Sequence, residues 1–182
     1  YSQIELRILA HLCGDEHLIG AFATGQDIHR RTASVIYGIP EVEVTPEMRS
    51  ATKAINFGII YGMSAHGLSR ELELSHEDAT AFMDAYFQQY PKVRAFVDTQ
   101  MAQAQRDGYV QKLLGRRRYL PEVHSPDPMI RQLGQRLAVN TPIQGTAADL
   151  IKRAMVTLDA ELNRARLQSR MLLQVHDELM FE

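Results

Sequence analysis

The tripeptide Thr45-Pro46-Glu47 constrains the fold of this chain more than any other feature. Threonine is a preferred N-cap residue, proline suits the first helical position, and an acidic side chain in the first turn complements the helix dipole. We therefore expect a helix that begins at Pro46 and runs to about Tyr61-Gly62.

Other boundary residues predict further helices. Pro91 and Gly108 predict helices over 75–90 and 91–107. Ser2 to Glu5 fits a capping box at the start of another helix, which continues with apolar residues at helical spacing.

The second half of the chain predicts two more helices and two hairpins. Thr141-Pro142 predicts a break between helices over about 129–140 and 144–166. Residues 109–120 and 171–182 each predict two short strands joined by a turn. The expected fold is therefore α+β and mainly helical.

Composition excludes several classes of protein. The 182 residues are 45% hydrophobic and 23% charged, as in an ordinary globular protein. No run approaches the roughly 20 apolar residues of a membrane helix, so we expect no membrane partner. The one cysteine, Cys13, excludes an internal disulfide and a zinc site built from cysteines.

The net charge of the chain hides segments of opposite charge. A formal net charge of -2 by itself disfavours a nucleic-acid partner. However, residues 106–136 carry seven basic and three acidic side chains, whereas residues 171–182 carry three acidic ones and no basic ones. This segregation is typical of a protein that holds a polyanion beside a metal ion, although solvated helix faces explain each run separately.

Arg49, Lys53, Phe57 and Tyr61 follow one another at four-residue intervals. On a helix they form a stripe about 120° wide and roughly 18 Å long, with the cations toward the N-terminus and the rings toward the C-terminus. A nucleoside triphosphate matches this layout. An amphipathic helix with core aromatics and solvated cations has the same spacing, and spacing alone favours that simpler interpretation.

Asp177 and Glu178, preceded by His176, lie at the turn of the expected C-terminal hairpin. Neighbouring strand residues face opposite sides, so both carboxylates cannot enter one core. Because Mg²⁺ often takes only one or two protein carboxylates, the turn is a candidate metal site. A polar turn between buried strands is the commoner explanation of such a pair.

Basic and amide side chains predict a nucleic-acid contact. Arginines gather in Gly115-Arg116-Arg117-Arg118-Tyr119, and Arg136, Asn140 and Gln144 repeat the four-residue spacing. Guanidinium groups bind phosphate oxygens, and amides reach sugar or base edges. Arginine-rich hairpins also serve solubility alone, and the break expected at Pro142 interrupts the stripe.

In combination, these motifs resemble the family A DNA polymerases of the bacterial DNA polymerase I type. The likeness spans the whole chain, with several long motifs in the family's order. The stretches that carry it are Tyr1-Ser2-Gln3-Ile4-Glu5-Leu6-Arg7, Asp27-Ile28-His29, Arg49-x₃-Lys53-x₃-Phe57-Gly58-x₂-Tyr61-Gly62, Gly115–Tyr119, Pro142–Asp149 and Gln174-Val175-His176-Asp177-Glu178.

The resemblance implies polymerase fingers plus part of the palm: 1–12 as a palm fragment, 13–130 as fingers, and 131–182 as a palm fragment ending in the catalytic hairpin. It implies DNA synthesis in replication and repair, in which a primer 3′-hydroxyl attacks the α-phosphate of a dNTP with the help of two Mg²⁺ ions. The expected partners are primer–template DNA and dNTPs, and we expect a monomer in the bacterial cytoplasm.

The resemblance also implies roles for single residues. Asp177 would bind metal, with Glu178 in support, and Lys53 would give a proton to the departing pyrophosphate. Contacts to the nucleotide would come from Arg49, Lys53 and His29 on the phosphates, from Phe57 and Tyr61 at the base and templating positions, and from Glu5 against a ribose 2′-hydroxyl. Contacts to the primer–template duplex would come from His176, Arg136, Asn140 and Gln144.

One departure from the family pattern concerns the first motif. In the family an Asp, the other metal carboxylate, immediately precedes the residue that matches Tyr1. Tyr1 would then offer only its backbone carbonyl to a metal ion. We expect the sequence to be a piece of a longer polymerase and the isolated chain to be nearly inactive.

Two alternatives remain open. A nucleic-acid-binding module without catalysis would use the same basic residues but would not require Asp177 or the Arg49–Tyr61 stripe. A single-subunit RNA polymerase is disfavoured by Glu5, which should exclude ribose, and by Phe57, where such polymerases usually carry Tyr.

Overall fold

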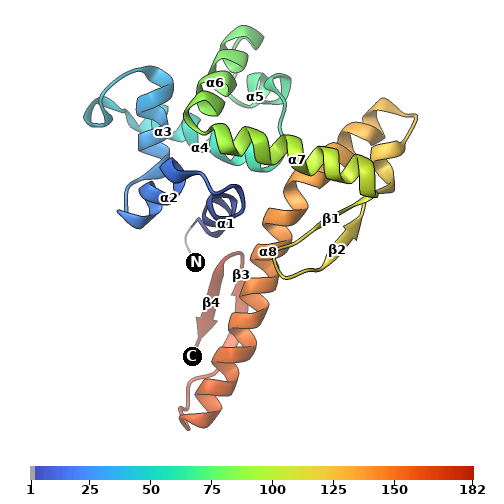
Figure 1. Cartoon of the computed structure of the whole chain (residues 1–182). Helices are drawn as coiled ribbons and strands as arrows, with labels where there is room; N and C mark the ends of the chain where they lie inside the picture. The colour runs from blue at the N-terminus through green and yellow to red at the C-terminus, as the bar shows by residue number, and fades with distance from the viewer. Residues whose placement is uncertain (1–2) are drawn as a thin grey trace.

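Helices dominate the computed structural model, which describes residues 3–182 (Figure 1). The helices are α1 (Ile4–Cys13), α2 (Glu16–Ala23), α3 (Ile28–Tyr37), α4 (Pro46–Ile60), α5 (Ala65–Glu71), α6 (His76–Gln89), α7 (Pro91–Asp107) and α8 (Pro128–Arg164), with 3₁₀ turns η1 (Glu41–Glu43) and η2 (Pro121–His124). Two antiparallel hairpins pair β1 (Tyr109–Gln111) with β2 (Arg117–Tyr119) and β3 (Met171–Val175) with β4 (Glu178–Phe181).

The caps confirm the expected helix boundaries. Thr45 Oγ1 accepts a hydrogen bond from the Met48 N–H at 3.3 Å, so α4 begins at Pro46 as its sequence predicts. The Ser75 hydroxyl caps α6 in the same way, and α7 ends at Gly108 in the left-handed region. The capping box at Ser2 lies outside the described residues.

Three short helices, α2, α3 and α5, were not predicted from the sequence. Asp15 and Asp27 each accept two backbone N–H groups at the start of α2 and α3. These are ordinary Asp N-caps, which satisfy donors that the first turn leaves unpaired. The Asp27 cap places His29 in the first turn of α3.

The predicted helix break at Thr141-Pro142 is wrong, because α8 is one helix of 37 residues with Pro142 inside it. A proline in a helix interior removes one backbone hydrogen bond and crowds the preceding turn. Here Val139, Thr141, Pro142 and Ile143 are all buried, so packing of this stretch outweighs that local cost. The helical register therefore continues unbroken through this stretch.

Two apolar clusters hold the helices together. The larger joins the inner faces of α1, α4, α6 and α8, and the smaller lies under the first hairpin and η2. Members of the larger include Leu9, Ile55, Tyr86 and Ile143; members of the smaller include Val110, Leu120 and Ala138. Together they fix α4 against α1 and α8, and this position sets the site described below.

The C-terminal hairpin forms as predicted. Val175 pairs with Glu178, so His176 and Asp177 make the turn, with His176 at a positive φ of 50°. The strands expose Leu172, Val175 and Phe181. Within the described residues, no helix is both long enough and apolar enough to span a membrane.

Candidate active site

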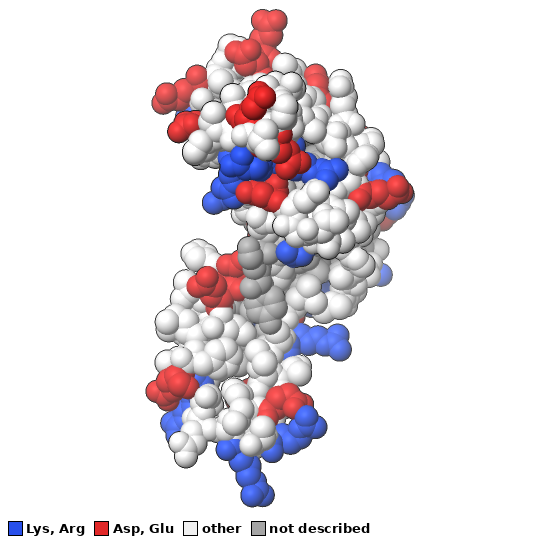
Figure 2. All heavy atoms as spheres, turned by 90° about the vertical axis from the view of Figure 1, so that its left-hand side faces the viewer, with Lys and Arg blue, Asp and Glu red and all other residues white. Residues whose placement is uncertain are grey.

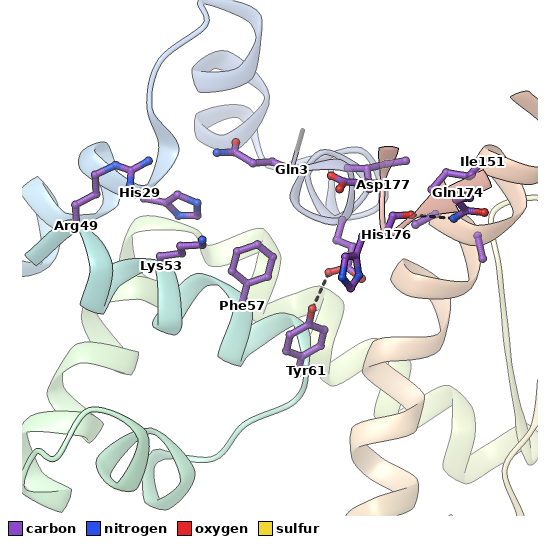
Figure 3. A pocket seen from close by; sticks show the side chains of 14 residues that line it. Gln3, His29, Arg49, Lys53, Phe57, Tyr61, Ile151, Gln174, His176 and Asp177 are labelled. Atoms are coloured by element: carbon purple, nitrogen blue, oxygen red, sulfur yellow. Dashed lines mark hydrogen bonds between the residues drawn. The ribbon is translucent and has the colours of Figure 1, made fainter. Parts of the chain in front are cut away.

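A cavity of about 690 Å³ brings together residues from α1, α3, α4, α8 and the β3–β4 turn (Figure 3). One side consists of the α4 stripe, and the turn of the C-terminal hairpin lies across from it. Eight of the predicted site residues line this cavity: Glu5, His29, Arg49, Lys53, Phe57, Tyr61, His176 and Asp177. Residues separated by more than a hundred positions in the chain therefore share one space.

Arg49 is held in place by an acid from another helix. Its Nε donates to Asp27 Oδ2 at 2.6 Å, while Asp27 Oδ1 caps α3. Burial alone would raise the pKa of Asp27, but the hydrogen bonds from Arg49 and from backbone N–H groups outweigh it and hold that pKa below its usual range. Within residues 3–182 the other guanidinium N–H groups of Arg49 make no hydrogen bond, so they are available to another acceptor.

His29 lies in the interior at the edge of the cavity. Its side chain is only 2% exposed, and Nδ1 lies 2.9 Å from Nδ2 of Asn56 on α4. Burial, with the nearby cations of Arg49 and Lys53, lowers the pKa of His29 to about 4, although Asp27 opposes the shift. His29 is therefore neutral at physiological pH.

Aromatic rings continue the stripe along α4. The Phe57 ring lies 5.9 Å from the His29 ring and 6.1 Å from the Tyr61 ring, with which it is nearly parallel. These separations are typical of favourable ring contacts. The stripe thus presents cations at one end of the cavity and flat apolar surface at the other.

Tyr61 and Glu5 join α4 to α1. The Tyr61 hydroxyl donates to Glu5 Oε2 at 3.0 Å. Burial and the adjacent Glu5 carboxylate raise the pKa of Tyr61 to about 12, against a hydrogen bond from Gln144. Tyr61 therefore remains a hydrogen-bond donor at neutral pH.

The hairpin turn contributes one carboxylate to the cavity. Asp177 and His176 line it, and the Gln174 amide donates to the His176 carbonyl at 2.8 Å, which ties the turn together. Glu178 is exposed on β4 and does not line the cavity. Tyr1, the other expected metal ligand, lies outside the described residues.

Three of the four predicted duplex contacts, Arg136, Asn140 and Gln144, follow one another along α8, outside the cavity lining, whereas His176 lines the cavity. Gly62, just past α4, approaches the Arg136 backbone closely. The Asn140 amide, with its nitrogen turned toward α4, donates to the Ile60 carbonyl and, at 3.2 Å, to the Arg136 carbonyl. This part of α8 therefore holds the C-terminal end of α4.

A second acid organises the basic hairpin loop. Asp149 on α8 is buried and accepts from Arg116 at 2.7 Å, with the Lys112 ammonium 3.6 Å away. Arg117 lies over the Tyr109 ring. The loop between β1 and β2 is thus fixed to α8, with Arg117 and Arg118 exposed.

Charged side chains are unevenly distributed over the surface. Figure 2 shows acidic side chains over the top of one face, a band of basic side chains below them, and a further basic group at the bottom. A low net charge therefore coexists with strongly basic regions.

A comparison with protein-family models decides the family. The model described as DNA polymerase family A matches residues 1–182. The chain belongs to DNA polymerase family A.

Known family A relatives are similar along the entire chain. It is 54% identical to the thermostable DNA polymerase I of Thermus aquaticus and 54% identical to DNA polymerase I of Mycobacterium bovis, in each case over all 182 residues. It spans 22% and 20% of the length of these two relatives. The chain thus corresponds to about a fifth of such a protein.

A solved family A structure has the same fold. The polymerase domain of Pol1 from M. smegmatis, in complex with a DNA primer–template and dNTP, superimposes with a TM-score of 0.96 at 50% identity. The match covers all of this chain and 32% of that one. The mainly helical α+β fold is therefore shared with a polymerase domain.

Two residues of this candidate site were not predicted from the sequence to have a role. Asp27 was noted only as part of a family motif, yet it orients Arg49. Asn56 is fully buried beside His29. The sequence signal for Asn56 is its polar side chain between Ile55 and Phe57 on an amphipathic helix. The wall formed by Ala147, Ala148 and Ile151 was also missed, because the expected helix break obscured which face of α8 turns inward.

Proposed function

We propose that this chain carries the nucleotide-binding and part of the catalytic surface of a DNA-directed DNA polymerase. The observation that supports this most strongly is the shared cavity, in which Arg49, Lys53 and Phe57 on α4 lie across from Asp177 at the C-terminal turn. A dNTP placed there has its phosphates against the cations and its base or sugar against the Phe57 ring. The Pol1 structure in complex with primer–template and dNTP, similar over the whole chain, supports this proposal.

Several residues of the chain would have separate roles in nucleotidyl transfer. The primer 3′-hydroxyl attacks the α-phosphate and pyrophosphate departs. Arg49 and Lys53 neutralise charge on the triphosphate, and Lys53 gives a proton to the leaving group. Glu5, whose carboxylate accepts a hydrogen bond from Tyr61, would exclude a ribose 2′-hydroxyl.

The donor set at the turn fits Mg²⁺ in part. Among residues 3–182 no cluster of three or more His, Cys, Asp or Glu side chains could hold a metal ion. Mg²⁺, however, is usually bound by one or two carboxylates together with substrate phosphates and water. Asp177 would supply such a carboxylate, with Glu178 in support. When bound, two Mg²⁺ ions would stabilise charge on the reacting oxygens.

DNA would lie along α8. Arg136, Asn140, Gln144 and His176 are proposed to contact the primer–template duplex. We propose that the chain divides into a palm fragment at 1–12, fingers at 13–130 and a palm fragment at 131–182. The proposed DNA contacts on α8 and the hairpin turn would then all belong to the second palm fragment.

Primer extension tests the proposed function. In a full-length polymerase that carries this chain, Asp177→Asn should reduce dNTP incorporation at least a hundredfold, because the candidate metal ligand loses its charge. Asp98→Asn, at an exposed position on α7, is the matched control and should extend primers normally. Equal extension by the two variants would refute the assignment of Asp177.

A further inference from the structure

Asn56 is a buried polar residue on the inner face of α4. Its side chain is fully buried, in a helix whose neighbouring Ile55, Ile59 and Ile60 belong to the core. Its Nδ2 lies 2.9 Å from Nδ1 of His29. Its Oδ1 has no hydrogen-bond partner in the described part of the chain.

This arrangement is costly for stability alone. A buried acceptor without a partner costs roughly 1–3 kcal/mol, and a leucine of similar size would avoid that loss. The contact that Asn56 does make is the one to the His29 ring. The side chain is therefore better explained by what it does to His29 than by its contribution to packing.

The hydrogen bond decides where the proton of His29 lies. A neutral imidazole carries one N–H, and an amide nitrogen can only donate. With the Asn56 amide nitrogen facing the ring, as in this structure, Nδ1 is the acceptor, which leaves the proton on Nε2. Among the described residues Nε2 has no hydrogen-bond partner, and His29 lines the cavity.

We propose that Asn56 is a positioning residue that fixes His29 in the Nε2–H tautomer, so that His29 offers a neutral N–H donor to a phosphate oxygen in the cavity. The role rests on the proposed nucleotide site. In the opposite tautomer the Nε2 lone pair would face that oxygen and repel it.

The charged groups around His29 suit this role. Arg49 and Lys53 already supply two cations to the cavity, and Asp27, which is not among the cavity-lining residues, binds Arg49. The low pKa of His29 keeps a third cation out of the cluster. A neutral donor adds direction to phosphate binding without adding charge that the fold would have to bury.

Nuclear magnetic resonance of ¹⁵N-labelled imidazoles tests the tautomer directly, in a full-length protein without nucleotide at pH 7.5. For His29 we expect a pyridine-type Nδ1 and a pyrrole-type Nε2. Asn56→Asp should move the proton to Nδ1, because a carboxylate can only accept. A pyrrole-type Nδ1 in the unmodified protein would overturn the proposal whether or not the protein is a polymerase.

A double-mutant cycle tests the functional part. Asn56→Leu should raise the KM for dNTP several-fold with a smaller effect on kcat, and it should have no further effect in a His29→Ala background. Thr52→Val, buried one turn earlier on α4 with its hydroxyl donating to the Met48 carbonyl, should leave both constants unchanged. An Asn56→Leu effect that persists at full size without His29 would show that Asn56 acts through packing and not through the imidazole. Absence of any extension in the parent protein would instead refute the proposed function.

Discussion

Gly62 lies so close to Arg136 that a Cβ on Gly62 would be 3.1 Å from the Arg136 Cα. Gly62 also has a positive φ of 66°, which directs the chain out of α4 toward α5. The contact joins the end of the nucleotide-facing helix to the proposed DNA-facing residue of α8. The position of α4 over the cavity therefore depends on a residue with no side chain.

Gly62→Ala should destabilise the polymerase domain by about 2–4 kcal/mol, because it combines backbone strain with a steric clash. Gly25→Ala is the matched control. Gly25 has a similar φ of 67° but open space around the added methyl, so it should cost about 1–2 kcal/mol. Urea unfolding measures both, and equal losses would show that the Arg136 contact is unimportant.

Stability should fall between pH 6.5 and pH 4 because of His29. Its pKa is about 4 in the folded chain and about 6.5 when unfolded, so the unfolded chain binds more protons in this window. The free energy of unfolding should decrease by up to roughly 3 kcal/mol as the pH drops. His29→Gln, which does not titrate, should remove most of that slope in urea unfolding measured at several pH values. A slope that is unchanged in the variant would assign the effect to other groups.

Glu5→Ala should raise ribonucleotide incorporation relative to deoxyribonucleotide incorporation, because it opens the space beside the Tyr61 hydroxyl. Glu5→Gln keeps the size and can still accept from Tyr61, so it should remain selective. The ratio of kcat/KM for the two nucleotides is the measurement. An unchanged ratio in Glu5→Ala would remove Glu5 from the role of steric gate.

Asp149→Asn should loosen the basic loop between β1 and β2. The buried carboxylate lies beside the cations of Arg116 and Lys112, and its replacement should cost roughly 1–3 kcal/mol. Asp107→Asn removes a comparable pair with Arg106 on the surface and should cause no measurable change. Thermal unfolding of the two variants compares them, and similar midpoints would contradict an anchoring role for Asp149.

The sequence predicted local structure best where a single residue acts directly on the backbone. Thr45, Pro91 and Gly108 mark helix boundaries through capping and dihedral preference, and each boundary is confirmed. The same kind of local rule predicted a helix break at Pro142, and that prediction is wrong, because burial of the neighbouring residues outweighs the local cost of a proline inside a helix. Capping and dihedral preferences depend on neighbouring residues in the sequence, so they do not include the free energy of packing against other helices.

The site was predictable only in part, for a related reason. The α4 stripe follows from helical spacing, but spacing alone could not separate a ligand surface from a core face. Asp27 and Asn56 act through contacts to Arg49 and His29 on other helices, which no local pattern encodes. The family resemblance depended on several motifs in the family's order, because each motif alone has a simpler structural explanation.

Amine labelling of Lys53 tests whether α4 and the C-terminal turn form one dNTP site. In a full-length polymerase with bound primer–template, the complementary dNTP should protect Lys53 at least tenfold, while Lys152, exposed on α8 outside the cavity, should react at the same rate with and without nucleotide. Equal labelling of Lys53 with and without saturating dNTP would show that α4 and the C-terminal turn do not form one dNTP site.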